Sequence, residues 1–239
     1  MARITDEHKK KYQSITPPWG FNGMGEIVFL RTYSRKKENG DSETLPDTLQ
    51  RVINGAIDIG VVYTQEEAER LFDHMFNLRC SFSGRSLWQL GTSLTQEFSG
   101  TSLNNCYFTN IEKIEDFELL FDYLMLGGGV GFSVERSKIH DLPKVKSAVS
   151  ITHERTNDAD IIVPDSRQGW RRLLHSVLKS YFETGRSFTY STILVREYGA
   201  PLKKFGGTAS GPGALIDGIA DICKVLENRV GKKLRSIDV

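Results

Sequence analysis

Cysteine is the residue type with the widest chemical range in this sequence, and Cys106 is the cysteine with the most suggestive surroundings. Cys80, Cys106 and Cys223 lie far apart and form no CxxC or Cys/His spacing typical of a zinc site. Cys106 lies in LNNCYF, residues 103–108, a pattern that predicts a buried strand. Such a thiol is either a small buried hydrophobe or a redox group whose partner lies elsewhere, and the pattern leaves both open.

Two glycine-rich segments could bring backbone amides close to a phosphate or a ribose. GGGVG at 127–131 follows a predicted helix, so helix termination explains it without a ligand, and its spacing is not GxGxxG. FGGTASGPG at 205–213 follows Lys203 and Lys204 and precedes a predicted helix, an arrangement that suits an anion. A plain loop-to-helix connection is its alternative. The five histidines show no HxxxH pair, which argues against a metal site.

The elements that must position these segments alternate between strand and helix. The predicted strand at 103–108, a helix carrying Phe117 and Phe121, and a strand at 130–134 follow one another within about 30 residues, which is typical of a parallel βαβ unit. A helix capped by Asp165, a strand at 189–195 and a helix after FGGTASGPG come next. The pattern therefore predicts the α/β class.

Local signals also occur at the two ends of the chain. Residues 27–33 predict an apolar extended segment, residues 35–43 a solvated turn, and Thr64 with Glu67 a capping box that begins an amphipathic helix. Near the end of the sequence, Ser236 has the character of a helix cap. An interrupted helix and a frayed tail are both compatible with the three residues after it.

Composition excludes several classes of protein. The 239 residues are 39% hydrophobic and 26% charged, with 31 basic and 30 acidic side chains, a balance that indicates a globular protein rather than a disordered chain or a basic binder of nucleic acid. The N-terminus lacks the apolar core of a signal peptide, and no run of about 18 apolar residues predicts a membrane span. With unpaired cysteines, we expect a cytoplasmic protein without membrane or direct nucleic-acid partners.

Five ordered blocks and one upstream segment together resemble a known family. The blocks are SGRSLWQLGT (83–92), SLNNCYF (102–108), LGGGVGFSVERSKI (126–139), PDSRQGW (164–170) and YGAPLKKFGGTASGP (198–212), and GEIVFLRTYSR (25–35) precedes them. In this order they resemble the adenosylcobalamin-dependent ribonucleoside-triphosphate reductases, the monomeric type of class II ribonucleotide reductase. The di-iron and glycyl-radical classes of reductase are alternatives, because all classes share the barrel and a cysteine at the position of Cys106. GGGVGFS together with PDSRQGW favours the cobalamin-dependent class.

The resemblance implies a fold and a division into domains. The expected fold is α/β, the first part of a ten-stranded α/β barrel with an N-terminal helical region and an inserted allosteric lobe. Residues 1–82 correspond to the mostly helical region, and residues 83–239 correspond to the first barrel strands and helices. The effector-binding lobe is expected at about 134–205.

The resemblance also implies a chemistry for Cys106. In this family a thiyl radical on another cysteine removes the ribose 3′ hydrogen, and a cysteine pair then reduces the 2′ carbon. Cys106 matches one member of the pair, would form a disulfide as the 2′ hydroxyl leaves as water, and would be reduced by a thioredoxin-type protein. The implied cofactor is adenosylcobalamin, with most of its site outside this chain, and Cys80 and Cys223 are interpreted as structural.

An allosteric site is implied as well, because the family binds a deoxynucleoside triphosphate effector and signals to the substrate through a loop that aligns with residues 196–207. Residues 133–138 resemble the phosphate-side loop of that site, and Trp170 is interpreted as a packing residue. The candidate effector-binding residues are Asp116, Arg136, Lys138, Arg196, Lys203 and Lys204, and the candidate substrate-binding residues are Gly206 and Gly207.

The other motifs of the family do not occur in these residues. They include the thiyl-forming cysteine, the second reducing cysteine, the catalytic glutamate and asparagine, and the C-terminal cysteines. We therefore expect an N-terminal part that requires a complementary C-terminal segment or chain, as a split gene, an intein junction or a truncation would produce. A non-catalytic nucleotide-binding regulator that keeps the effector lobe is the alternative.

Overall fold

The computed structural model describes residues 2–202 and 207–239, apart from the side chains of residues 98 and 99. The chain divides into two compact units, which we describe separately: residues up to Asn105 form the first unit, and the described residues from Cys106 onward form the second. The expected domain boundary at residue 82 and the effector-binding lobe at about 134–205 stay predictions. In the described residues, each helix is too short or too polar to cross a membrane.

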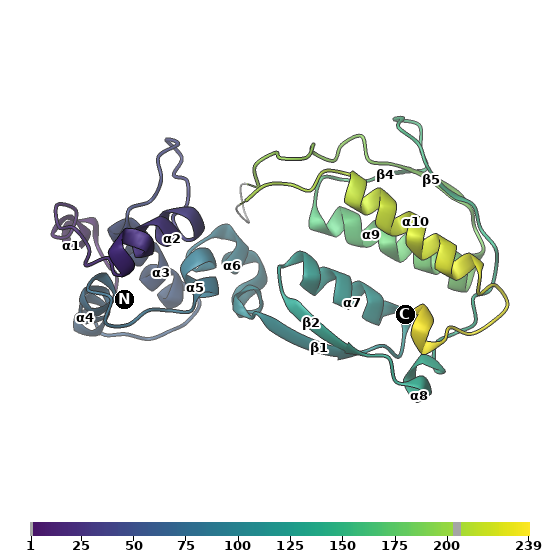
Figure 1. Cartoon of the computed structure of the whole chain (residues 1–239), viewed down its shortest axis with the longest axis horizontal. Helices are drawn as coiled ribbons and strands as arrows, with labels where there is room; N and C mark the ends of the chain where they lie inside the picture. The colour runs from purple at the N-terminus through teal and green to yellow at the C-terminus, as the bar shows by residue number, and fades with distance from the viewer. Residues whose placement is uncertain (1, 203–206) are drawn as a thin grey trace. The chain divides into compact units, whose positions relative to one another are not determined.

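The first unit is helical in its described residues. Its helices are α1 (Asp6–Lys10), α2 (Met24–Thr32), α3 (Leu45–Asp58), α4 (Gln65–Phe76), α5 (Gly84–Gln89) and α6 (Ser93–Phe98), with short 3₁₀ helices at Phe21–Gly23 and Ser99–Leu103 (Figure 1). α3 packs against α4. Leu49, Ile53, Phe72 and Phe76 are among the buried residues of the core that these helices share.

Capping boxes begin the two longest helices of this unit. The Thr64 side chain accepts from the backbone N–H of Glu67, whose carboxylate accepts from the Thr64 N–H, which confirms the predicted start of α4. Thr44 and Asp47 form the same box at α3. In each box the side chains bind backbone groups that lack helical partners, so the boundary is set by local chemistry.

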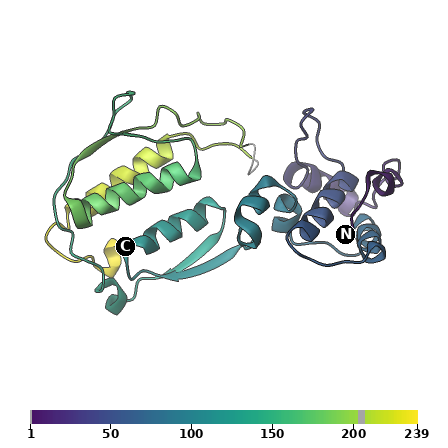
Figure 2. The same cartoon turned by 180° about the vertical axis from the view of Figure 1, so that it is seen from behind.

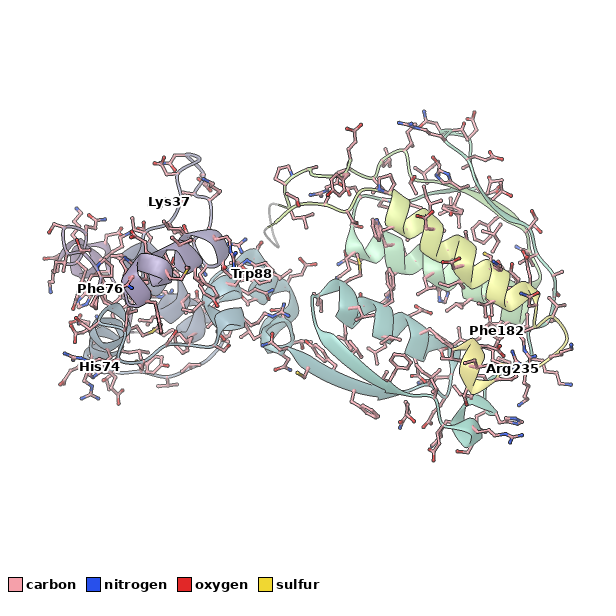
Figure 3. All side chains as sticks on the ribbon, in the orientation of Figure 1. Lys37, His74, Phe76, Trp88, Phe182 and Arg235 are labelled. Carbon is pink, nitrogen blue, oxygen red and sulfur yellow. The ribbon has the colours of Figure 1, made fainter. Side chains whose placement is uncertain are left out.

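Residues 27–33 are not extended as predicted, because most of them belong to α2. An apolar run fits a strand and a helix equally well, and the contacts of one face decide between them. Phe29 is buried and its ring lies 5.4 Å from that of Trp19, whereas Ile27 is 60% exposed. The predicted turn at 35–43 is confirmed: Gly40 has a φ of +88°, and Lys37 lies in the projecting loop (Figure 3).

The second unit begins with the predicted βαβ arrangement. β1 (Cys106–Asn110) and β2 (Gly129–Ser133) are parallel, with Cys106 opposite Gly129, and α7 (Ile114–Met125) connects them. α7 lies between this strand pair and α9 in both views (Figures 1 and 2). The strand after Asn105 is shorter than the predicted strand at 103–108, because Leu103 ends a 3₁₀ helix.

A second parallel sheet completes this unit. The strands of this sheet are β3 (Ile151–His153), β4 (Ile161–Ile162) and β5 (Phe188–Ser191), in the order β3-β5-β4. The second unit also contains the helices α8 (Arg136–Ile139), α9 (Arg167–Lys179) and α10 (Gly213–Glu227). Leu173, Val177 and Tyr181 lie in the buried core that these elements share. The class is α/β as expected, but the described strands form two separate sheets and not a closed barrel.

Two helix boundaries in this unit differ from the sequence prediction. The cap of α9 is Ser166, whose hydroxyl accepts from the Gly169 N–H at 3.0 Å, and not Asp165. Ser236 begins a short 3₁₀ helix, Ser236–Asp238, but the residue at its N-cap is Arg235. At α9 the hydroxyl one place away makes the predicted kind of bond, whereas at Arg235 the backbone N–H and the guanidinium instead donate to the carboxylate of Asp238.

Candidate functional site

Cys106 is the first residue of β1, and its side chain lies on the face of the strand pair away from α7. Side chains alternate along a strand, so Cys106 and Phe108 share one face and Tyr107 lies on the other. The Tyr107 ring stacks on Tyr123 of α7, with centroids 4.1 Å apart and planes 8° apart. Tyr107 thus marks the helix-covered face, and Cys106 belongs to the opposite, open face.

The open face is accessible in the described residues. Cys106 is exposed, and Phe108 is 69% exposed with its ring against Gly131, where an added Cβ would lie 3.2 Å from the Phe108 Cδ2. Residues paired in a parallel ladder point to the same face, so Gly129 and Gly131 place bare backbone beside Cys106 and Phe108. A thiol beside strands without side chains leaves room for a ligand to approach closely. The predicted burial of Cys106 was wrong.

Helix α7 ends where the sequence predicted, at the three glycines. Gly127 has a φ of +75°, and the Gly128 N–H donates to the Tyr123 carbonyl at 3.0 Å. The left-handed conformation favours glycine and satisfies the last carbonyls of the helix. GGGVG therefore terminates the helix and also supplies the glycines of β2.

Asp116 has a structural partner in this fold. Its Oδ2 accepts from the backbone N–H groups of Glu112 and Lys113, both at 2.9 Å, and the residue is only 9% exposed. This carboxylate caps the N-terminus of α7, where a negative charge is favourable. Nothing in these contacts bears on a ribose, so the effector role of Asp116 stays a prediction.

Arg136 and Lys138 both lie on α8, and their surroundings differ. Lys138 Nζ pairs with Glu112 Oε1 at 2.8 Å, and this hydrogen bond raises the pKa of the lysine above its ordinary value. Arg136 is exposed and lines a pocket of about 250 Å³. The pocket is lined by Arg136, Ile139, His140, Leu234, Arg235 and Ser236.

Arg235 and His140 are basic residues at this pocket that sequence reasoning missed. Arg235 lies on the segment that leads into the last 3₁₀ helix (Figure 3) and pairs with Asp238 at 2.7 Å. Hydrogen bonds from Arg235 lower the pKa of Asp238 to about 2. The basic run that includes Lys232, Lys233 and Arg235 was the available signal, but about a hundred residues separate it from Arg136.

The predicted specificity loop is described only at its ends. Arg196 Nε donates to Asp165 Oδ2 at 2.7 Å, and its Nη1 donates to the Pro201 carbonyl at 3.1 Å. Gly207 has a φ of +80°, and its carbonyl accepts from the Leu202 N–H. The predicted positions Lys203, Lys204 and Gly206 lie outside the described residues. In this structure, Arg196 holds the base of the loop.

The other two cysteines do not form a redox pair with Cys106 in this structure. Cys80 is exposed in the first unit, and Cys223 is buried on α10. Burial raises the pKa of the Cys223 thiol. The Tyr181 side chain contacts Cys223 and donates to Glu227 Oε1 at 3.2 Å. These surroundings fit a packing role for Cys223.

Comparisons with known proteins identify the family. Residues 4–92 match the ribonucleotide reductase alpha domain, and residues 139–226 match the insertion domain of B12-dependent ribonucleotide reductase. The chain is 34% identical over 248 residues to the adenosylcobalamin-dependent ribonucleoside-triphosphate reductase of Euglena gracilis, covering 94% of this chain and 32% of the relative. It is 35% identical over 286 residues to the enzyme of that name from Lactobacillus delbrueckii subsp. bulgaricus, covering 94% and 38%.

A solved structure supports the same assignment. The crystal structure of B-12 dependent (class II) ribonucleotide reductase superposes with a TM-score of 0.81 and 31% identity, covering 100% of this chain and 41% of that one. The chain thus spans about a third to two fifths of the length of the proteins it matches. Residues 93–138, which carry Cys106 and Arg136, lie between the two domain matches. The chain belongs to the ribonucleotide reductase family and is homologous to the N-terminal portion of the adenosylcobalamin-dependent class II enzymes.

Proposed function

We propose that this chain is the N-terminal part of a reductase that converts ribonucleoside triphosphates to 2′-deoxyribonucleoside triphosphates. The single observation that carries the proposal is the position of Cys106 at the start of β1, exposed on the face opposite α7. In α/β barrels the helices form the outer layer, so this face is the one that a completed barrel would turn inward. The similarity of the chain to the named relatives supports the class of reaction.

Cys106 acts in this proposal as one of two reducing thiols. The 2′ hydroxyl leaves as water, the 2′ carbon gains hydrogen, and two thiols lose their hydrogens and two electrons as one S–S bond forms. A thioredoxin-type dithiol restores the pair by exchange. In this proposal the second thiol and the radical-forming cysteine both come from a complementary reductase segment, because Cys223 is buried and the family motifs that carry those cysteines do not occur in these residues.

Adenosylcobalamin is the proposed cofactor because the relatives are named as dependent on it. Its role when bound is to provide the radical that starts the reaction. The described residues offer no observation that ties a side chain to this group, so no residue of this chain is assigned to it. The chemistry derived for Cys106 does not pass through it.

The effector is proposed to bind at α8, with its phosphates at the pocket that Arg136 lines. Arg136, Arg235 and His140 place basic groups around a volume of about 250 Å³, which suits a phosphate chain. Arg196, Lys203 and Lys204 would then contact the effector or the substrate from the loop, with Gly206 and Gly207 near the substrate. The coupling between the two ligands is reciprocal if it is allosteric.

The decisive experiment replaces Cys106 in the reductase assembled from this chain and its complementary segment. Cys106→Ser should abolish multiple turnovers with a thioredoxin-type reductant, whereas the matched Cys80→Ser should leave deoxynucleotide yield unchanged. A normal yield from Cys106→Ser would overturn the catalytic role. If effector-dependent binding remained while no assembly gave turnover, a regulatory nucleotide-binding protein would be the better description.

Arginine at the pocket is tested separately. Arg136→Ala should weaken the dependence of substrate choice on the effector, because it removes an exposed guanidinium from the pocket rim. Lys36→Ala in the first unit is a matched control, since it also removes one cation. Unaltered effector dependence in Arg136→Ala would remove this residue from the effector site.

A further inference from the structure

Tyr107, the residue directly after Cys106, has its ring packed closely on two sides. The ring of Tyr107 lies flat against that of Tyr123 on α7. On its β2 side it meets Gly128, where an added Cβ would lie 2.5 Å from Tyr107 Cε2 and 2.7 Å from Cδ2. The ring therefore occupies a slot formed by one aromatic side chain and one bare α carbon.

This slot determines which way Cys106 faces. Cys106 is the first residue of β1, and Asn104 and Asn105 before it are not part of the strand. The pairing with β2 fixes the alternation of side chains along β1, and the anchored ring of Tyr107 ties that alternation to the face covered by α7. With Tyr107 on the α7 side, the side chain of Cys106 must project from the open face.

Gly128 connects the same slot to the end of the helix. Its N–H donates to the carbonyl of Tyr123, the residue whose ring stacks on Tyr107. A side chain at position 128 would meet both the Tyr107 ring and the Tyr123 carbonyl, which would lie 3.1 Å from the added Cβ. The turn after α7, the stacked rings of Tyr107 and Tyr123, and the first residues of β1 are thus linked by direct contacts.

We propose that Tyr107, Tyr123 and Gly128 are positioning residues that hold the thiol of Cys106 on the open face of the strand pair. This inference rests on the proposed function for its catalytic consequence, but its structural part concerns this chain alone. The three residues do not touch substrate in the proposal. They act through Cys106 by fixing the backbone from which its thiol projects.

Hydrogen exchange on this chain tests the anchoring. Tyr107→Leu and Gly128→Ala should speed amide exchange in peptides covering 104–110 by about three- to tenfold, the effect of losing one aromatic pair. Tyr107→Phe keeps the ring and should restore slow exchange. Thr109→Val, on the same face of β1, is the matched control and should change nothing. Exchange in α9 should stay constant in all variants, because the effect is local.

A nitroxide on Cys106 reports the thiol itself. In a Cys80→Ser chain, with Cys223 buried, the label attaches at Cys106. Its spectrum should show restricted motion in the parent and in Tyr107→Phe, and faster motion in Tyr107→Leu and Gly128→Ala. A spectrum that is equally mobile in all four, or equally restricted in all four, would overturn the positioning role. If Tyr107→Leu does not fold, Gly128→Ala and Tyr107→Phe decide the result.

Turnover in the assembled reductase separates this inference from the proposed function. Gly128→Ala should lower kcat with little change in KM, because substrate contacts remain while the thiol is misplaced. A raised KM with normal kcat would contradict positioning. Normal turnover in Cys106→Ser would refute the proposed function. The hydrogen-exchange and spin-label results would still test the positioning of Cys106, because they are measured on this chain alone.

Discussion

The ion pair between Arg167 and Asp122 joins two parts of the second unit that matter for the proposed regulation. Asp122 lies on α7, which follows the Cys106 strand, and Arg167 begins α9, inside the insertion-domain match. Their side chains are 17% and 15% exposed, between the surface and the interior. We expect a coupling free energy of about 1–3 kcal/mol, above that of exposed pairs and below that of fully buried ones.

A double-mutant cycle measures this coupling. Asp122→Ala, Arg167→Ala and the double variant are unfolded in urea, and fluorescence of Trp170 on α9 follows the second unit after Trp19→Phe and Trp88→Phe substitutions. Arg171 also approaches Asp122, with Nη1 3.8 Å from Oδ2, so Arg167→Ala leaves Asp122 with a second cation nearby. The cycle isolates the interaction between Asp122 and Arg167, because what each side chain contributes through its other contacts cancels in the difference.

An exposed pair of the same chemistry provides the control. Arg3 and Asp58 in the first unit are 46% and 37% exposed, and their coupling should be at most about 1 kcal/mol. A coupling for Asp122 and Arg167 below about 0.5 kcal/mol, within the range of independent sites, would refute the argument from partial burial.

Two further predictions concern protonation. Burial opposes ionisation of Asp47, but hydrogen bonds from Lys37, Thr44 and Lys9 outweigh it and hold the pKa of Asp47 well below its ordinary value. Its stabilising effect is therefore present above pH 3.8 and is lost as the pH falls. Asp47→Asn should cost about 1–2 kcal/mol at pH 7 in urea unfolding and flatten the acid dependence; parallel pH profiles would contradict this. Because burial raises the pKa of Cys223, iodoacetamide at pH 8 should modify Cys106 but spare Cys223 until the chain unfolds, and equal rates by peptide mapping would be the contrary result.

Features that depend on neighbouring residues were predictable from the sequence. The capping box at Thr64 and the glycine stop after α7 both satisfy helix ends with groups a few residues away. The parallel βαβ order around α7 was also predictable, because about 30 residues of strand, helix and strand allow few arrangements. The resemblance to the reductases rests on ordered motifs, which are a property of the sequence as well.

Other features required contacts between distant residues. Residues 27–33 form most of α2, and Phe29 is buried there with its ring near that of Trp19. An apolar run alone does not distinguish such a helix from a strand. Asp165 pairs with Arg196 instead of capping α9, and the pairing spans 31 residues. The capping role of Asp116 also went unrecognised, since a carboxylate in a helix's first turn can face either the helix end or a ligand.

By itself, the sequence determined the reductase family, the α/β class, the start of α4 and the end of α7, since these follow from local hydrogen bonding and from motif order. Only the tertiary structure decided which face of β1 carries the thiol of Cys106. That face depends on a ring, Tyr107, that reaches Tyr123 on α7 and a glycine on the far side of the crossover. It likewise brought Arg136 to the same pocket as Arg235, because chain separation places no limit on which side chains packing can bring together.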